Sequence, residues 1–434
     1  MEELNSLSPL DGRYKKKTEK LRRYFSESSL VRYRTSIEIV YLIKLVEFLE
    51  IPYSEFEMFR MTDQEILRVK EIEKEVNHDV KAVELFLRER IGNKSILEFI
   101  HFGLTSQDVN SSSYILSMKD ANSDLIIPKL EKMTSEIEAK VFKWLEIPML
   151  SRTHGQTASP TTLGKEMMVF VERLKKQISQ LKDYRYTTKF GGAVGNFNSH
   201  VAAYPSKDWL KFGDEFVKSI GLERNRFTTQ IDHYDNYSEI FDILKRISTI
   251  LIDFCRDVWM YVSMDYFTQA NRKGEVGSSA MPHKINPINF ENAEGNLMIA
   301  VSMFEFMSRK LPISRLQRDL TDSTVLRNIG TCYGHFLIGL ESILSGMERL
   351  DINREKIKSD LQSNRIVLAE AIQTILRKEG IENSYLLIKD MTRGGKDLDT
   401  DEVIVSIEEK GIRLSEEAMK TISDLSVHNY IGRF

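Results

Sequence analysis

Apolar residues recur at intervals of three and four along most of this chain, which is the spacing of one face of an α-helix. The clearest stretch covers residues 237–267, where the periodic positions are Ile240, Ile243, Leu244, Ile247, Ile250, Leu251, Phe254, Val258 and Val262. Further apolar residues fall on its other faces: Ile252, Cys255, Trp259 and Met260. A long helix with so broad an apolar surface is expected to be buried among other helices, which can come from other subunits.

The same periodicity predicts further helices over residues 25–49, 63–90, 128–144 and 161–186. Thr62 or Asp63 can cap the second of these, and Pro128 suits the first position of the third. Only nine prolines occur, and residues 206–281 and 313–434 contain none. Strand signals are sparse, and the glycine-rich residues 190–196 are typical of a turn. We therefore predict an all-α fold.

The length of the chain limits the number of domains, and a change in apolar periodicity near residue 350 suggests a domain boundary. At roughly 100 to 200 residues per domain, a chain of 434 residues is expected to form two or three units. After Leu350 the apolar periods become shorter, a turn is predicted at residues 393–397, and Ser415 can cap a helix that starts with Glu416 and Glu417. This change predicts a small C-terminal helical domain.

Composition narrows the class of protein. The chain is 41% hydrophobic and 29% charged with a net charge of −3, as in soluble globular proteins that have no general attraction to nucleic acids. The basic clusters at residues 15–17 and 22–23 are short and are interpreted as solvated helix faces. No apolar run approaches the roughly 18 residues of a membrane span, and the acidic N-terminus lacks signal-peptide features. A cytoplasmic protein without membrane or nucleic-acid partners is expected.

Candidate chemistry gathers first at residues 273–287. Two glycines, Gly274 and Gly277, and two prolines make a continuous helix costly there, so a loop is predicted. Its polar members are Ser278, Ser279, His283, Lys284 and Asn286. Polar loops held between rigid elements often carry catalytic residues.

Each of these residues also has a simpler interpretation. Ser278 is not in a GxSxG nucleophile elbow, and it needs nearby cations, backbone N–H groups and exclusion of water before it can act as a base. Lys284 can be a solvated surface lysine or a carboxylate ligand. Asn286, followed by Pro287, is a good N-cap, a role that is compatible with binding an anion beside the exposed N–H groups.

Histidines and arginines elsewhere provide further candidates. His154 lies in a polar segment, and an imidazole with its usual pKa of about 6.5 can donate a proton near neutral pH. His78 and His101 are similar, and for all three a histidine bonded to backbone is the alternative. Arg318 and Arg327, with hydroxyl residues between them, suit a phosphate or carboxylate, although an ion-paired helix end has the same composition. The cysteines and histidines show no metal-binding spacing, so no metal site and no disulfide are predicted.

Several motifs taken together resemble a known family. Residues 277–287 (GSSAMPHKINP) resemble the signature loop of the fumarase/aspartase superfamily, whose members eliminate an amine, amide or water to release fumarate or a relative of it. Residues 8–14 (SPLDGRY), 77–84 (NHDVKAVE), 151–156 (SRTHGQ) and 318–328 (RDLTDSTVLRN) are similar to the adenylosuccinate lyase branch, in particular its bacterial members with an N-terminal DGRY segment. The resemblance extends from about residue 5 to residue 433.

The resemblance implies roles for individual residues. Ser278 would be the general base and His154 the general acid. The substrate would be bound by Arg13, Tyr14, Asn77, His78, Asp79, Thr105, Ser106, Gln230, Ser279, Lys284, Ile285, Asn286, Asn292, Arg318, Ser323, Thr324, Val325, Leu326 and Arg327. It also implies β-elimination of fumarate from adenylosuccinate and from the succinylated carboxamide ribotide of purine synthesis, without a metal or cofactor.

The family pattern implies an assembly as well. Domains are expected at residues 1–94, 95–347 and 348–434, the central one being a long-helix bundle that assembles into a homotetramer with active sites shared between subunits. Another lyase of the superfamily, such as argininosuccinate lyase or aspartase, is the nearest alternative. A helical oligomer that has lost its activity is another, but none of the residues that carry the expected chemistry is missing from the sequence.

Overall fold

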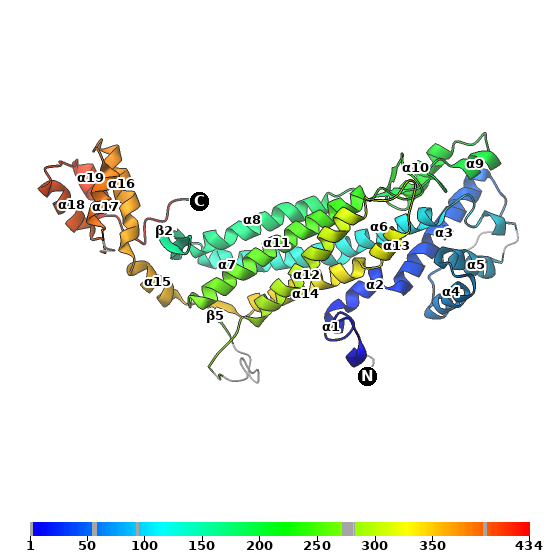
Figure 1. The fold of residues 1–434 in the computed structure, drawn as a ribbon, viewed down its shortest axis with the longest axis horizontal. Coiled ribbons are helices and arrows are strands. Elements are labelled where there is room, and N and C mark those ends of the chain that lie inside the picture. Colours follow the sequence, from blue (N-terminus) through cyan, green and yellow to red (C-terminus); the bar gives the residue numbers. More distant parts are fainter. Residues whose placement is uncertain (1–2, 54–58, 93–94, 271–280, 282, 394–396) are drawn as a thin grey trace. The chain divides into compact units, whose positions relative to one another are not determined.

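The computed structural model describes residues 3–53, 59–92, 95–270, 281, 283–393 and 397–434 (Figure 1). It divides into two compact units. Unit 1 contains Met1–Glu131, Lys176–Ile252 and Asn292–Ser342, and unit 2 contains Lys132–Lys175, Asp253–Glu291 and Ile343–Phe434. The predicted all-α class is confirmed, because the strands of the described residues form only three two-stranded sheets. The predicted three-domain division stays a prediction.

Five long helices contain residues of both units: α7 (Ile127–Trp144), α8 (Leu163–Lys182), α11 (Asp235–Ser263), α12 (Ile288–Lys310) and α14 (Ile329–Met347). Each matches a periodic stretch of the sequence to within a few residues where one was predicted. In unit 1, α11, α12 and α14 pack through aromatic side chains, since the Phe304 ring lies 5.8 Å from that of Phe241 and 5.9 Å from that of Tyr333. The predicted burial of the 237–267 helix is thereby confirmed for its apolar stripe from Ile240 to Val258, while Val262 is half-buried and Trp259 and Met260 are exposed.

Unit 1 contains further helices and strands. They are η1 (Glu3–Asn5), α1 (Lys15–Thr18), η2 (Glu19–Leu21), α2 (Arg22–Phe25), α3 (Glu27–Leu49), α4 (Asp63–Val76), α5 (Asp79–Ile91), η3 (Leu97–Phe99), α6 (Ser106–Ala121), η4 (Asn122–Ile126), β3 (Thr187–Lys189), α9 (Asn198–Ala203), α10 (Trp209–Ser219), β4 (Glu223–Asn225) and α13 (Thr321–Leu326). Figure 1 shows α3 beside α4 and α5, and the three helices share one apolar core. β3 and β4 pair in parallel.

Two sequence predictions about these helices were wrong. Residues 63–90 do not form one helix, because Asn77 adopts a left-handed conformation with φ of 52° and ends α4. Apolar residues continue at helical spacing on both sides of this break, so the periodicity of the sequence does not reveal it. The helix predicted over 128–144 is confirmed as α7, but Pro128 is not at its first position, since α6 continues through the π-helical turn η4 into Ile127. A π-turn accommodates the missing proline N–H without ending the helix.

Unit 2 contains the paired strands β1 (Pro148–Thr153) and β2 (Gln156–Thr162), and β5 (Phe267–Gln269) with β6 (Leu350–Ile352). Its C-terminal helices are α15 (Arg354–Gln362), η5 (Arg365–Leu368), α16 (Ala369–Lys378), α17 (Ser384–Met391), α18 (Thr400–Glu409) and α19 (Glu416–Ser423). They share a core with Leu150 of β1. The predicted cap is confirmed, because Ser415 Oγ accepts a hydrogen bond from the Ala418 N–H at 3.1 Å. None of the described helices is long and apolar enough to cross a membrane.

Candidate active site

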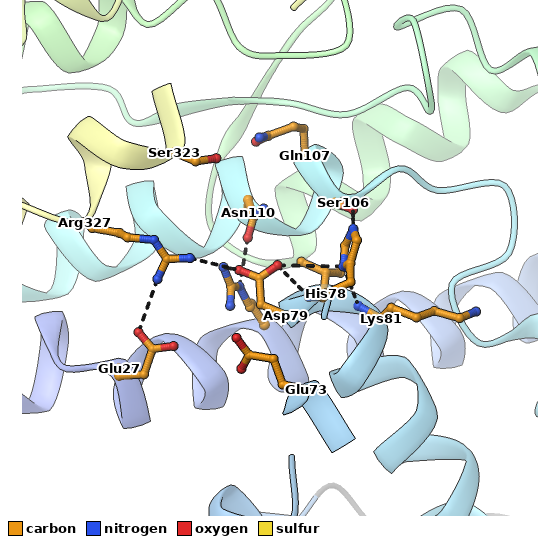
Figure 2. Close-up of polar contacts among 12 residues, drawn as sticks. Glu27, Glu73, His78, Asp79, Lys81, Ser106, Gln107, Asn110, Ser323 and Arg327 are labelled. Atoms are coloured by element: carbon orange, nitrogen blue, oxygen red, sulfur yellow. Dashed lines mark hydrogen bonds and ion pairs between the residues drawn. The ribbon is translucent and has the colours of Figure 1, made fainter. Parts of the chain in front are cut away.

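The break between α4 and α5 creates the first polar group of the site. Because Asn77 reverses the chain there, His78 becomes the N-cap of α5, and its Nδ1 accepts a hydrogen bond from the Lys81 N–H at 3.1 Å. Its Nε2 lies 3.4 Å from Ser106 Oγ, and Figure 2 shows the ring between α5 and the start of α6. The His78 side chain is half exposed, so it is available to a ligand.

Asp79 is held by two arginines, Arg34 and Arg327, and Figure 2 shows the contact with Arg327 as a dashed line. Its Oδ2 lies 2.6 Å from Arg34 and 3.5 Å from Arg327, and its Oδ1 accepts from the Val80 N–H at 2.9 Å. Burial favours the neutral acid, but the two guanidinium groups and the N–H group outweigh it and lower the pKa of Asp79. Asp79 is therefore an ionised carboxylate paired with both arginines, and its role in substrate binding stays a prediction.

The N-terminus of α6 lies beside this group and carries Thr105 as N-cap and Ser106 as first residue. Both are partly exposed. The first N–H groups of a helix have no partner within the helix, and the helix dipole makes this end electropositive. Together with Ser106 Oγ and His78, the terminus can bind a carboxylate.

A second set of polar side chains belongs to α13 and the residues around it. Arg318 donates to Gln230 Oε1 and to Ser323 Oγ, both at 3.3 Å. Ser323 and Arg327 lie four residues apart and therefore on one face of the helix. Thr324 is exposed, whereas the side chains of its successors Val325 and Leu326 are buried and can offer only backbone groups to a ligand.

A third group joins the N-terminal segment to α12. The Asn292 side-chain amide donates to the Tyr14 hydroxyl at 3.0 Å and its Oδ1 accepts from Ser342 at 2.9 Å. The hydrogen bond from Asn292 is the largest cause of a lowered pKa for Tyr14, with Asn296 and Arg13 acting in the same direction against burial. Arg13 is exposed. This end of the N-terminal segment can thus stabilise negative charge.

The remaining predicted residues lie in unit 2 or outside the described residues. His154 occupies the turn between β1 and β2, is exposed, and has a left-handed backbone with φ of 54°. Lys284 and Ile285 are exposed. Ser278 and Ser279, with Gly274 and Gly277, lie outside the described residues. The N-cap prediction for Asn286 was one position early, since α12 begins at Ile288 and Pro287 O accepts from the Glu291 N–H.

Sequence reasoning did not predict that three buried charged groups contact the site residues or their neighbours. Arg34 is 2% exposed and also donates from Nε to Asn110 at 2.8 Å. Asp322 accepts from the Tyr234 hydroxyl at 2.8 Å and from the Ser323 N–H at 2.7 Å. The third is Asp108, which is fully buried. The sequence contains one indication, which is a charged residue on an apolar helix face: Arg34 lies four residues after Leu30 and three after Val31.

No group of three or more His, Cys, Asp or Glu side chains suited to a metal ion occurs among the residues that the structure describes.

Comparisons with known proteins agree with this picture of an all-helical enzyme. The family described as Lyase matches residues 12–301, and the one described as Adenylosuccinate lyase C-terminal matches residues 314–431. Adenylosuccinate lyase of Dictyostelium discoideum is 45% identical over 454 aligned residues, which cover 99% of this chain and 97% of that protein. The enzyme of the same name from Escherichia coli strain K12 is 43% identical, with the same coverage.

Solved structures show the same fold at low sequence identity. The chain superposes on a fumarate lyase from Mesorhizobium sp. BNC1 with a TM-score of 0.74 at 20% identity, covering 95% of both chains. The 3-carboxy-cis,cis-muconate lactonizing enzyme from Pseudomonas putida gives a TM-score of 0.73 at 19% identity, covering 95% and 94%. The fold and the family match define a lyase of the fumarase/aspartase superfamily. Within it, the chain belongs to the adenylosuccinate lyase family.

Proposed function

We propose that this enzyme cleaves adenylosuccinate to AMP and fumarate, and the succinylated carboxamide ribotide to its carboxamide and fumarate. The observation that carries the proposal is the identity of 43–45% to adenylosuccinate lyases along 99% of the chain. The polar groups of unit 1 support it, because they offer separate partners for a carboxylate, at α6, and for a phosphate or ribose, at α13. Both relatives quoted above are adenylosuccinate lyases, and neither is an argininosuccinate lyase or an aspartase.

The proposed chemistry is a β-elimination. Ser278 removes a proton from the succinyl carbon beside a carboxylate, the C–N bond breaks with its electron pair moving to nitrogen, and His154 donates a proton to that nitrogen. The extra negative charge on the carboxylate must be stabilised by fixed donors. We assign this task to Lys284, Asn286 and the N-terminus of α6 with Thr105 and Ser106.

The nucleotide would be bound mostly at its phosphate and ribose. Ser323 of α13, Arg318 before this helix and Arg327 directly after it present a hydroxyl and two guanidinium groups, which suits a phosphate. Arg13 and Tyr14 supply a further cation and a phenol. His78, Gln230 and Asn292 would line the same pocket, while Asp79 acts by holding Arg327.

We further propose a homotetramer in which each active site combines residues of several subunits. Exposed apolar side chains on α12 support an oligomer, since Ile299 and Phe306 lie two helical turns apart on one face and are 45% and 51% exposed. Met298 adds to this face with 50% exposure. Light scattering coupled to size-exclusion chromatography tests the assembly, and a monomer at micromolar concentration would contradict it.

The activity is tested by following fumarate release from each substrate, with argininosuccinate and aspartate as controls. We expect turnover of both succinylated ribotides and none of the controls. Turnover of argininosuccinate or aspartate without turnover of adenylosuccinate would assign the chain to another activity of the superfamily. A Ser278→Ala enzyme with full activity would remove Ser278 from the role of base.

A further inference from the structure

A fully buried ion pair lies directly behind the start of α6. The Lys189 ammonium lies 2.6 Å from Asp108 Oδ1, and both side chains are 0% exposed. Lys189 also donates to the Gly192 carbonyl at 2.6 Å. Asp108 belongs to the first turn of α6, and Lys189 ends β3, so the pair connects two segments that are 81 residues apart in the chain.

Both carboxylate oxygens of Asp108 are occupied by donors from two different segments. Oδ2 accepts from the Thr105 N–H at 2.9 Å, which fixes the residue that caps α6. Oδ1 accepts from the Gly191 N–H at 2.9 Å, and the Gly192 N–H reaches both oxygens at 3.2 and 3.1 Å. One side chain therefore ties the start of α6 to the turn that follows β3.

The chain leading into α6 is closely packed against the turn after β3. Gly103 has φ of 66°, and a Cβ added there would lie 2.6 Å from the His200 ring. A Cβ on Gly192 would lie 3.1 Å from the Gly103 carbonyl oxygen. The Tyr41 hydroxyl donates to the Phe102 carbonyl at 2.6 Å and lies 3.0 Å from His200 Nε2. The residues before Thr105 are thereby held against the same turn that Asp108 binds.

Stability alone is a weak explanation for such a pair. Removing two charges from water costs several kcal/mol per ion, and apolar residues of similar volume often stabilise a core equally well. A carboxylate has one property that an apolar side chain lacks, which is that it fixes the direction of every N–H group bonded to it. We propose that the Asp108–Lys189 pair positions the N-terminus of α6, with Thr105 and Ser106, for binding a substrate carboxylate. The inference rests on the proposed function for the role of that terminus.

Asp108→Asn is the sharpest test, because the change keeps the shape of the side chain. The amide must turn its NH2 group toward either the Thr105 N–H or the donors from Lys189, Gly191 and Gly192, so one contact becomes a clash between donors. We expect kcat/KM for adenylosuccinate to fall by about 10²-fold, as for a displacement of roughly 1 Å in a positioning group. KM should rise because the carboxylate is bound in the ground state, and kcat should fall because its extra negative charge develops only on the way to the transition state.

Val69→Ala provides the matched control, since Val69 is buried in the α3–α5 core and has no polar contact to lose. It should lower the melting temperature while leaving kcat/KM near the wild-type value. The double variant Asp108→Asn/Lys189→Met should recover stability relative to Asp108→Asn, because no unpaired lysine remains, without recovering kcat/KM. If activity follows melting temperature across these variants, the pair is only structural and the proposal fails.

Hydrogen exchange separates this proposal from the proposed activity. In Asp108→Asn, amides of residues 101–106 and 190–196 should exchange faster than in wild type, and they should not do so in Val69→Ala. Unchanged exchange in these segments would overturn the positioning role whatever the enzyme turns over. A wild-type enzyme that is inactive on adenylosuccinate would instead contradict the proposed function, and the exchange result would still decide whether the pair positions α6.

Discussion

Arg34 and Asp79 form an ion pair of 2.6 Å between α3 and the start of α5, and the arginine side chain is 2% exposed. Arg34 contacts Asp79 Oδ2, and Arg327 approaches the same oxygen at 3.5 Å. Two arginines far apart in sequence, one buried and one half exposed, thus share one carboxylate oxygen, and Arg327 also lies 3.5 Å from Glu27.

Replacing Arg34 by methionine should destabilise the protein. The change leaves the partly buried Asp79 with only the longer contact to Arg327, and removal of one member of a buried pair costs about 3 kcal/mol. Urea unfolding followed by circular dichroism measures the loss. Arg32→Met is the matched control on the same helix, because Arg32 pairs with Asp63, which is 93% exposed, and such pairs contribute less than about 1 kcal/mol. Equal losses in the two variants would mean that burial of the pair does not matter.

Arg318→Met should weaken substrate binding more than catalysis. A hydrogen bond from a charged donor contributes about 1.5–3 kcal/mol, so KM for adenylosuccinate should rise about 10- to 100-fold with a smaller change in kcat. Steady-state kinetics of fumarate release gives both constants. Arg315→Met is the control, since that side chain is 79% exposed and pairs with Asp319. A KM that rises in the control and not in Arg318→Met would contradict the phosphate assignment.

His154→Asn should remove activity without unfolding the protein. Asparagine tolerates the left-handed backbone that His154 adopts, and the side chain is exposed, so the melting temperature should stay close to wild type. Loss of a general acid should lower kcat by about 10²- to 10⁴-fold. Kinetics and a thermal melt of the same preparation check both statements. Retention of wild-type kcat would exclude His154 as the acid.

Mixing two inactive variants tests whether sites are shared between subunits. If Ser278 and His154 of one site come from different subunits, mixed tetramers of Ser278→Ala and His154→Asn contain some sites in which both residues are intact. Activity should therefore reappear after the two proteins are unfolded together in denaturant and refolded. Each protein refolded alone is the control. No recovery, in mixtures shown by mass spectrometry to contain both chains, would place the two residues in the same subunit.

His101 should make stability depend on pH above neutrality. Burial opposes its charge, but Glu38 at 2.5 Å outweighs burial and raises the pKa of His101 above its usual 6.5. The charged pair therefore contributes fully below pH 6.5 and is lost as the pH rises through the folded-state pKa. His101→Asn keeps the left-handed backbone and removes this proton. The difference in unfolding free energy between wild type and variant should shrink as the pH rises from 6.5 through the folded-state pKa, and a constant difference would contradict the assignment.

The sequence by itself determined the helical class, the approximate extent of most long helices, and caps such as Thr62 and Ser415. These features depend on neighbours three and four residues away, so a single stretch of chain contains the information. The residues quoted for the family resemblance also came from sequence, and the comparisons confirm the family. Roles for Ser278 and His154 rest on that resemblance and stay predictions.

Only the tertiary structure decided which distant residues meet. It ended α4 at Asn77, paired Arg34 with Asp79, and connected Asp108 to Lys189 through a contact between segments 81 residues apart. Such pairs form because close packing removes water from polar groups, which must then find partners wherever the fold brings them. Periodicity along the chain says that a position is buried, and only the packing of helices against one another says which polar group it meets there.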